Sequence, residues 1–150
     1  MNSSADEPPF DEDVRVVEVD IPSDVRFIER VVELVRRECE VMAFGVRQTT
    51  LNVPVALAEA LSNAILRGNR EDPDKKVFVR ATVDSEQLIV EVADQGPGFD
   101  IDECAVDPTT PDHIEREYGR GLFLMRQLMD HVERVESPGG SIVRMTLHRE

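Results

Sequence analysis

The fold is decided by residues 77–94, Val-Phe-Val-Arg-Ala-Thr-Val-Asp-Ser-Glu-Gln-Leu-Ile-Val-Glu-Val-Ala-Asp. The alternation of apolar and polar residues predicts two strands, Val77–Asp84 and Gln87–Asp94, joined by a tight hairpin across Ser85-Glu86. Each strand should have one buried and one wetter face. The apolar residues of the expected buried face are Val77, Val79, Ala81, Val83, Leu88, Val90 and Val92.

Upstream of this hairpin, the sequence predicts one strand and one helix. Residues 14–20 have the composition of a strand, and Ser23 is suited to cap a helix that runs to about Met42. Gly45 should follow the end of this helix. The apolar stripe expected to face the core consists of Phe27, Val31, Leu34 and Val35.

Two more helices and two more strands complete the expected fold. Pro54 suits the first turn of a helix that continues to Arg67 and stops at Gly68-Asn69. After a loop over residues 96–119, we expect a helix over residues 121–129 and strands over 131–137 and 141–149. The sum is an α/β two-layer sandwich, with one mixed, mostly antiparallel sheet and three helices on one face.

Composition bounds the domain organisation and the kinds of partner. Residues 1–13 are acidic and without a period, so we expect a disordered acidic tail before one domain over residues 14–150. No stretch approaches the roughly 20 apolar residues of a membrane helix, and the N-terminus lacks a signal peptide's features, which predicts a cytoplasmic protein without a membrane partner. The net charge of −14 argues against nucleic-acid binding and favours a basic protein surface as partner, although it could simply maintain solubility.

The first cluster of candidate functional residues is Glu59 and Asn63, within Ala-Glu-Ala-Leu-Ser-Asn-Ala. Their i, i+4 spacing places a carboxylate and an amide on one face of the second helix. Taken alone, such a pair is more often part of a solvated helix face than of a site.

The second cluster is Asp94-Gln-Gly-Pro-Gly-Phe-Asp100, directly after a strand. Asp94 has the parity of Val90 and Val92, so its carboxylate should point under the helices, where it needs hydrogen-bond donors. An adenine amino group could be one. Gly96 and Gly98 would let the backbone approach a ligand closely. Alone, this segment is more typical of an ordinary turn than of a binding site.

The third cluster is Gly119-Arg120-Gly121, at the expected start of the last helix. A glycine-rich helix N-terminus presents free N–H groups to phosphate. The spacing is neither that of a Walker P-loop nor that of a Rossmann turn.

In this order, with a long loop between the second and third, the clusters resemble the N, G1 and G2 boxes of the Bergerat, or histidine-kinase-like, ATPases. The resemblance covers about residues 14–148. The phrase Gly119-Arg-Gly-Leu-Phe-Leu-Met-Arg-Gln-Leu-Met-Asp130 is similar to that of the stand-alone anti-sigma-factor serine kinases. Family members often carry histidine and glycine after the N box, where this chain has Arg67-Gly68.

The resemblance implies a role for each matching residue of the three clusters. Glu59 would be the general base, Asn63 would help to hold Mg²⁺, and Asp94 would bind adenine. The adenine pocket would be shaped by Gly96 and Gly98, the nucleotide phosphates would be contacted around Gly119, Arg120, Gly121 and Leu122, and the intervening loop would be the ATP lid.

The resemblance also implies a function. It predicts an ATP- and Mg²⁺-dependent serine/threonine-protein kinase that phosphorylates an anti-anti-sigma (STAS-domain) protein and sequesters a sigma factor. It leaves open whether the protein forms a homodimer. Two alternatives remain at this point. One is a non-catalytic module whose shape depends on nucleotide, and the other is a switch kinase acting on a scaffold or phosphatase pathway without a sigma factor.

Overall fold

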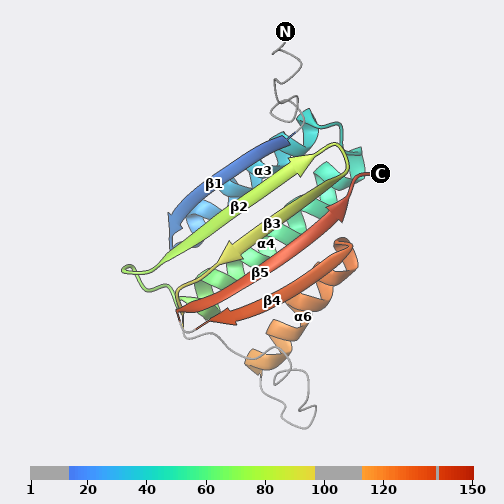
Figure 1. Cartoon of the computed structure of the whole chain (residues 1–150). Helices are drawn as coiled ribbons and strands as arrows, with labels where there is room; N and C mark the ends of the chain where they lie inside the picture. Colours follow the sequence, from blue (N-terminus) through green and yellow to red (C-terminus); the bar gives the residue numbers. More distant parts are fainter. Residues whose placement is uncertain (1–13, 97–112, 138) are drawn as a thin grey trace.

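The structure, a computed structural model, describes residues 14–96, 113–137 and 139–150. A twisted sheet forms one layer and the helices form the other (Figure 1). The predicted tail over residues 1–13, Gly98 and most of the predicted lid lie outside the described residues.

The sheet has five strands in the order β1-β2-β3-β5-β4, and each of these neighbouring pairs is antiparallel. The strands are β1 (Val14–Pro22), β2 (Lys76–Asp84), β3 (Gln87–Ala93), β4 (His131–Ser137) and β5 (Gly140–His148). The predicted hairpin is confirmed between β2 and β3, where Asp84 Oδ1 accepts hydrogen bonds from the backbone N–H groups of Glu86 and Gln87. All seven apolar positions assigned to its inner face are buried.

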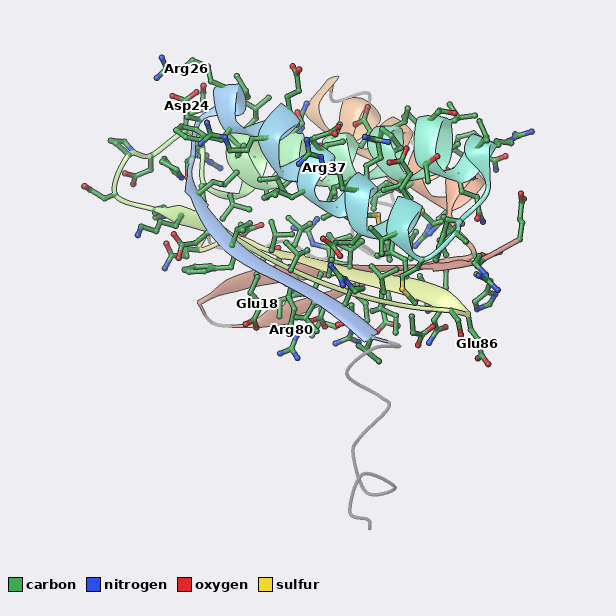
Figure 2. The ribbon with its side chains drawn as sticks, turned by 90° about the horizontal axis from the view of Figure 1, so that it is seen from above. Glu18, Asp24, Arg26, Arg37, Arg80 and Glu86 are labelled. Atoms are coloured by element: carbon green, nitrogen blue, oxygen red, sulfur yellow. The ribbon has the colours of Figure 1, made fainter. Side chains whose placement is uncertain are left out.

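The helical layer covers one face of this sheet (Figure 2). Its α-helices are α3 (Ile28–Val41), α4 (Val53–Asn63) and α6 (His113–Leu128). A 3₁₀ turn, η1 (Val25–Phe27), precedes α3, and two π-helical turns, η2 (Gln48–Asn52) and η3 (Ala64–Gly68), flank α4. The apolar core lies between the two layers, so the predicted two-layer α/β sandwich is confirmed.

The other face of the sheet carries charged side chains. Glu18 and Arg80 project from it, away from the helices (Figure 2), and their charged groups are 3.5 Å apart. Arg144 pairs there with Glu91 at 2.7 Å and with Glu133 at 3.1 Å. The alternation read from the sequence therefore assigns the two faces correctly.

The details predicted for the first helix are partly wrong. Asp24, and not Ser23, is the N-cap residue, because its carboxylate accepts from the Arg26 backbone N–H at 2.9 Å. The left-handed residue after α3 is Ala43, with φ 63°, and not Gly45. Val31 and Val35 face the core as expected, whereas Leu34 is 37% exposed because it lies at the edge of the stripe.

The second helix begins where predicted, because α4 starts at Val53 and Pro54 lies in its first turn. The preceding residues 46–52 are also helical, so the chain enters α4 directly from η2. The wider π turn η2 directly before α4 accommodates a proline ring that would disrupt a regular α-helical ladder.

The third helix begins earlier than predicted, at His113. Residues 113–120, expected in the loop and at the helix start, are helical. The segment His-Ile-Glu-Arg-Glu-Tyr contains strong helix formers, and α6 packs against α4, which offsets the cost of two internal glycines of about 1 kcal/mol each.

Candidate nucleotide-binding site

Asp94 follows β3 and points under the helices, as its parity predicted. It is 9% exposed. Its Oδ1 accepts from the backbone N–H groups of Gly96 (3.0 Å) and Ser141 (3.2 Å), and its Oδ2 accepts from Ser141 Oγ (2.9 Å). Three donors therefore fix one acceptor group at the end of the sheet, an arrangement suited to recognising a donor on a ligand.

Glycines surround Asp94 at three positions where no side chain would fit. A Cβ on Gly68 would overlap the Asp94 carboxylate, and a Cβ on Gly140 would overlap the Asp94 carbonyl oxygen. A Cβ on Gly96 would overlap the carbonyl oxygen of Gly68. The end of η3 and the two strand ends are thus in direct backbone contact around one carboxylate.

Asn69 holds this region together and was predicted only as part of a helix stop. It is 1% exposed. Its Nδ2 donates to Ser23 Oγ and to the Lys76 carbonyl oxygen, both at 2.9 Å, and its Oδ1 accepts from the Gln95 backbone N–H at 2.7 Å. One amide therefore links the segment after β1, the start of β2 and the residue beside Asp94.

Glu59 and Asn63 lie on one face of α4, both half-buried, and they meet α6 at Gly121. A Cβ on Gly121 would lie 3.2 Å from Glu59 Oε2 and 3.2 Å from Asn63 Nδ2. The next residue, Leu122, is buried in the core and anchors α6 at this point. The first and third sequence clusters are therefore brought together, as the resemblance implied.

The conformation expected for the third cluster is wrong. Gly119, Arg120 and Gly121 lie inside α6, more than one turn after its start, and do not form a helix N-terminus. Within an α-helix, backbone N–H groups bond to carbonyl groups of the preceding turn. In this structure, Gly121 allows α4 and α6 to approach closely, because it has no side chain where it lies against Glu59 and Asn63.

The surroundings of Asn63 fit a hard cation that takes few ligands from the protein and the rest from bound substrate. Asn63 Nδ2 is buried and has no hydrogen-bond partner among the described residues, so none of them engages its amide through that atom. Among the described residues, no three His, Cys, Asp or Glu side chains form a metal-binding group. Mg²⁺ commonly takes one or two protein oxygens together with substrate phosphates, and the Asn63 amide oxygen could supply one.

Ser141 and Gly140, which adjoin Asp94, were missed as site residues. The sequence places Gly140 only in the connection between the expected strands over residues 131–137 and 141–149, and Ser141 only at a strand start. Pairing between β3 and β5 brings this strand start to Asp94, whose backbone N–H donates to the Ser141 carbonyl oxygen at 2.9 Å. The signal available in the sequence was a glycine-serine pair at a strand start. Only the strand order shows that this pair lies beside Asp94.

Within the described ranges, no helix has the length and apolar character needed to cross a membrane.

Comparison with known proteins identifies the family. Residues 22–147 match the family model described as histidine kinase-like ATPase domain. The chain belongs to this family. The family assignment agrees with the placement of the three clusters around one end of the sheet and one face of α4.

The sequence relatives narrow the assignment. The chain is 40% identical to serine-protein kinase RsbW of Bacillus subtilis (strain 168) over 100 residues, which cover 63% of this chain and 62% of that protein. It is 32% identical to anti-sigma F factor of Thermoanaerobacter sp. (strain X514) over 97 residues, which cover 63% of this chain and 67% of that protein. The chain spans a little under two thirds of the RsbW relative. The resemblance to the anti-sigma-factor serine kinases is confirmed at the family level.

Solved structures agree on the fold. The RsbU and RsbW domains of Rv1364c from Mycobacterium tuberculosis match with a TM-score of 0.65 at 14% identity, covering 91% of this chain and 33% of that one. The catalytic domain of histidine kinase ThkA matches with a TM-score of 0.53 at 14% identity, covering 89% of this chain and 97% of that one. At these identities the likeness concerns the fold alone.

Proposed function

We propose that residues 14–150 form an ATP-dependent protein serine/threonine kinase domain that also acts as an anti-sigma factor. Its substrate would be a serine or threonine of a STAS-domain anti-anti-sigma protein, and the protein that it sequesters would be a sigma factor. The observation that carries this proposal is the meeting of Glu59 and Asn63 with Gly121 across α4 and α6. The names of the relatives, serine-protein kinase and anti-sigma F factor, support the same activity.

Recognition of ATP would begin at Asp94. Its carboxylate is held by three protein donors and can accept a further hydrogen bond from the exocyclic amino group of adenine. Gly96 and Gly98 would shape this pocket. The base would therefore be bound near η3, and the triphosphate would run along α4 toward Asn63 and Glu59, about 7–14 Å away along the helix axis.

Phosphoryl transfer would take place beside Glu59. The Glu59 carboxylate would accept the proton of the acceptor hydroxyl, which makes the oxygen a better nucleophile. Asn63 would hold Mg²⁺ through its amide oxygen, and bound Mg²⁺ neutralises charge on the phosphates. Gly119 and Gly121 would keep α6 free of side chains beside the phosphates, and Arg120 and Leu122 would flank that contact.

The activity is tested by Glu59→Gln, which keeps the size and polarity of the side chain but cannot take up the hydroxyl proton. Single-turnover phosphorylation of a STAS partner at saturating Mg·ATP should fall about 10²- to 10⁴-fold. Affinities for ATP and for the sigma factor should remain within about twofold, because neither binding step needs a base. Glu86→Gln, the same change on the exposed hairpin, is the matched control.

Two results would contradict the proposal. Phosphorylation by Glu59→Gln within threefold of wild type would remove the base assignment. Wild-type protein that binds ATP but phosphorylates no STAS protein would leave a nucleotide-dependent interaction module in place of a kinase.

A further inference from the structure

A chain of two hydrogen bonds links Arg134, a half-buried residue, to Asp94. Arg134 lies on β4, where Nη2 donates to Ser141 Oγ at 2.9 Å. Ser141 Oγ in turn donates to Asp94 Oδ2 at 2.9 Å, and Ser141 is only 2% exposed. Arg134 has the parity of the buried Val132, and its Nε and Nη1 atoms are shielded from solvent. The Arg134 guanidinium is therefore connected to the Asp94 carboxylate through one hydroxyl group, that of Ser141.

The chemistry of the three groups fixes the direction of these bonds. A guanidinium group can only donate hydrogen bonds, whereas a hydroxyl group can donate one and accept others. Because Ser141 Oγ accepts from Arg134, its one proton is directed to Asp94. Without that guanidinium, the hydroxyl group could rotate and donate its proton elsewhere.

We propose that Arg134 is a positioning residue that sets selectivity for adenine, acting through Ser141 on Asp94. This inference rests on Asp94 as the adenine-binding residue of the proposed function. With the Ser141 proton committed, the Asp94–Ser141 pair offers an acceptor to the ligand. An acceptor pairs with the 6-amino group of adenine and repels the 6-oxo group of hypoxanthine or guanine.

Loss of the Arg134 guanidinium changes which hydrogen bonds the Asp94–Ser141 pair can make with a ligand. The freed Ser141 hydroxyl can turn its proton toward an oxo oxygen, so a 6-oxo purine is no longer rejected as strongly. ATP loses part of its advantage for the same reason. A purely structural arginine would weaken the binding of both nucleotides by similar factors, so the ratio of the two affinities is the informative quantity.

The test compares ATP with inosine triphosphate, whose base differs from adenine by a 6-oxo group and the accompanying N1–H. Dissociation constants for both are measured by calorimetry in wild type, Arg134→Met and Arg134→Lys. Arg134→Met should lower the preference for ATP about tenfold, the usual scale of one hydrogen bond to a charged group. Arg134→Lys should restore most of the preference, because an ammonium group also donates.

A double-mutant cycle tests whether the effect passes through Ser141. Ser141→Ala should itself reduce the preference for ATP, and in that background Arg134→Met should change the preference less than twofold. Arg144→Met is the matched control, because Arg144 lies on the neighbouring strand but on the open face of the sheet, paired with Glu91 and Glu133. The preference of the Arg144→Met protein for ATP over inosine triphosphate should equal that of wild type.

The failures of the two proposals are distinguishable. An unchanged preference in folded Arg134→Met, or a tenfold change that persists in Ser141→Ala, would overturn this inference and leave the kinase proposal standing. If Arg134→Met does not fold, an unchanged preference in Ser141→Ala overturns it equally. Wild-type protein that binds neither nucleotide would overturn both.

Discussion

The two ends of the site are built differently. At the end proposed to bind adenine (the base end), formed by Gly68, Asp94, Gly96 and Ser141, backbone lies against backbone and the carboxylate has three protein donors. At the end proposed to bind the phosphates (the phosphate end), formed by Glu59, Asn63 and Gly121, side chains meet one glycine, and Asn63 Nδ2 has no partner among the described residues.

This difference indicates which end is ready for its ligand. A preorganised group loses little conformational entropy when it binds, so the base end can contribute affinity and selectivity. Side chains such as Glu59 and Asn63 can rotate, so the phosphate end can adjust to groups that move during a reaction. The comparison predicts that the base end tolerates no added atoms, whereas the phosphate end tolerates them at the expense of rate.

The largest effect should come from Gly96→Ala, because the new Cβ would overlap the carbonyl oxygen of Gly68, a backbone atom that cannot rotate away. We expect a loss of more than about 3 kcal/mol in the free energy of unfolding, measured by urea denaturation. Gly139→Ala is the control, since a Cβ there meets no atom of the described residues within 4 Å. It should stay within about 0.5 kcal/mol of wild type. Equal stability of the two variants would show that the base end is not closely packed.

Asp94→Asn should weaken ATP binding at least tenfold. The substitution replaces an acceptor oxygen by a donor beside the adenine amino group, with an expected loss of about 1–3 kcal/mol, measured by calorimetry. Asp20→Asn is the control, because Asp20 is exposed at the edge of the sheet. Unchanged ATP affinity in a folded Asp94→Asn protein would contradict the role of Asp94 in binding adenine.

Gly121→Ala should leave stability nearly unaltered but slow phosphoryl transfer. Alanine favours the helix by about 1 kcal/mol relative to glycine, which offsets the displacement of Glu59 and Asn63 by the new methyl group, 3.2 Å from each. We expect a change in the free energy of unfolding below about 1 kcal/mol and transfer about tenfold slower. Transfer at the wild-type rate would show that the contact between α4 and α6 does not position Glu59.

The last prediction concerns Cys39, a reference position in α3 outside both ends, where no effect is expected at neutral pH. Burial raises the pKa of its thiol from 9.0 to about 12, so the unfolded chain releases this proton at lower pH than the folded one. Below pH 9 the thiol is protonated in both states and contributes nothing. Between pH 9 and 12 its presence should lower the free energy of unfolding by up to about 1.4 kcal/mol per pH unit. Cys39→Ala should show a shallower decline in urea denaturation above pH 9. Identical declines would show that the thiol is not buried from water.

Local patterns predicted the sheet and the relation of Asp94 to it. Alternation over residues 77–94 is a property of neighbouring residues, and it identified both strands and the buried side of Asp94. The i, i+4 spacing of Glu59 and Asn63 likewise predicted a shared helix face. These features survive because neither depends on which segments meet.

What could not be predicted depends on contacts between distant segments. The early start of α6 reflects its packing against α4, which offsets the low helix propensity of the glycines at 119 and 121. Asn69 has ordinary sequence surroundings, and its importance comes largely from Ser23 and Gln95, 46 and 26 residues away. Arg134 is only seven residues from Ser141, and it matters because the pairing of β3 with β5 brings Ser141 to Asp94, 47 residues away. Predicting them would require the register of all five strands.

The glycine packing around Asp94 also bears on how substitution tolerance at this site should be interpreted. In a saturation mutagenesis library selected only for folded, soluble protein, without nucleotide and without a partner, positions 68, 96 and 140 should already be depleted of every other residue. Depletion at these positions would reflect the close packing of the fold and not the chemistry of the site. Position 59, whose half-buried side chain can rotate, should accept many residues in that library and become restricted only when phosphorylation itself is selected. The two selections together would separate residues retained for assembly from residues retained for chemistry.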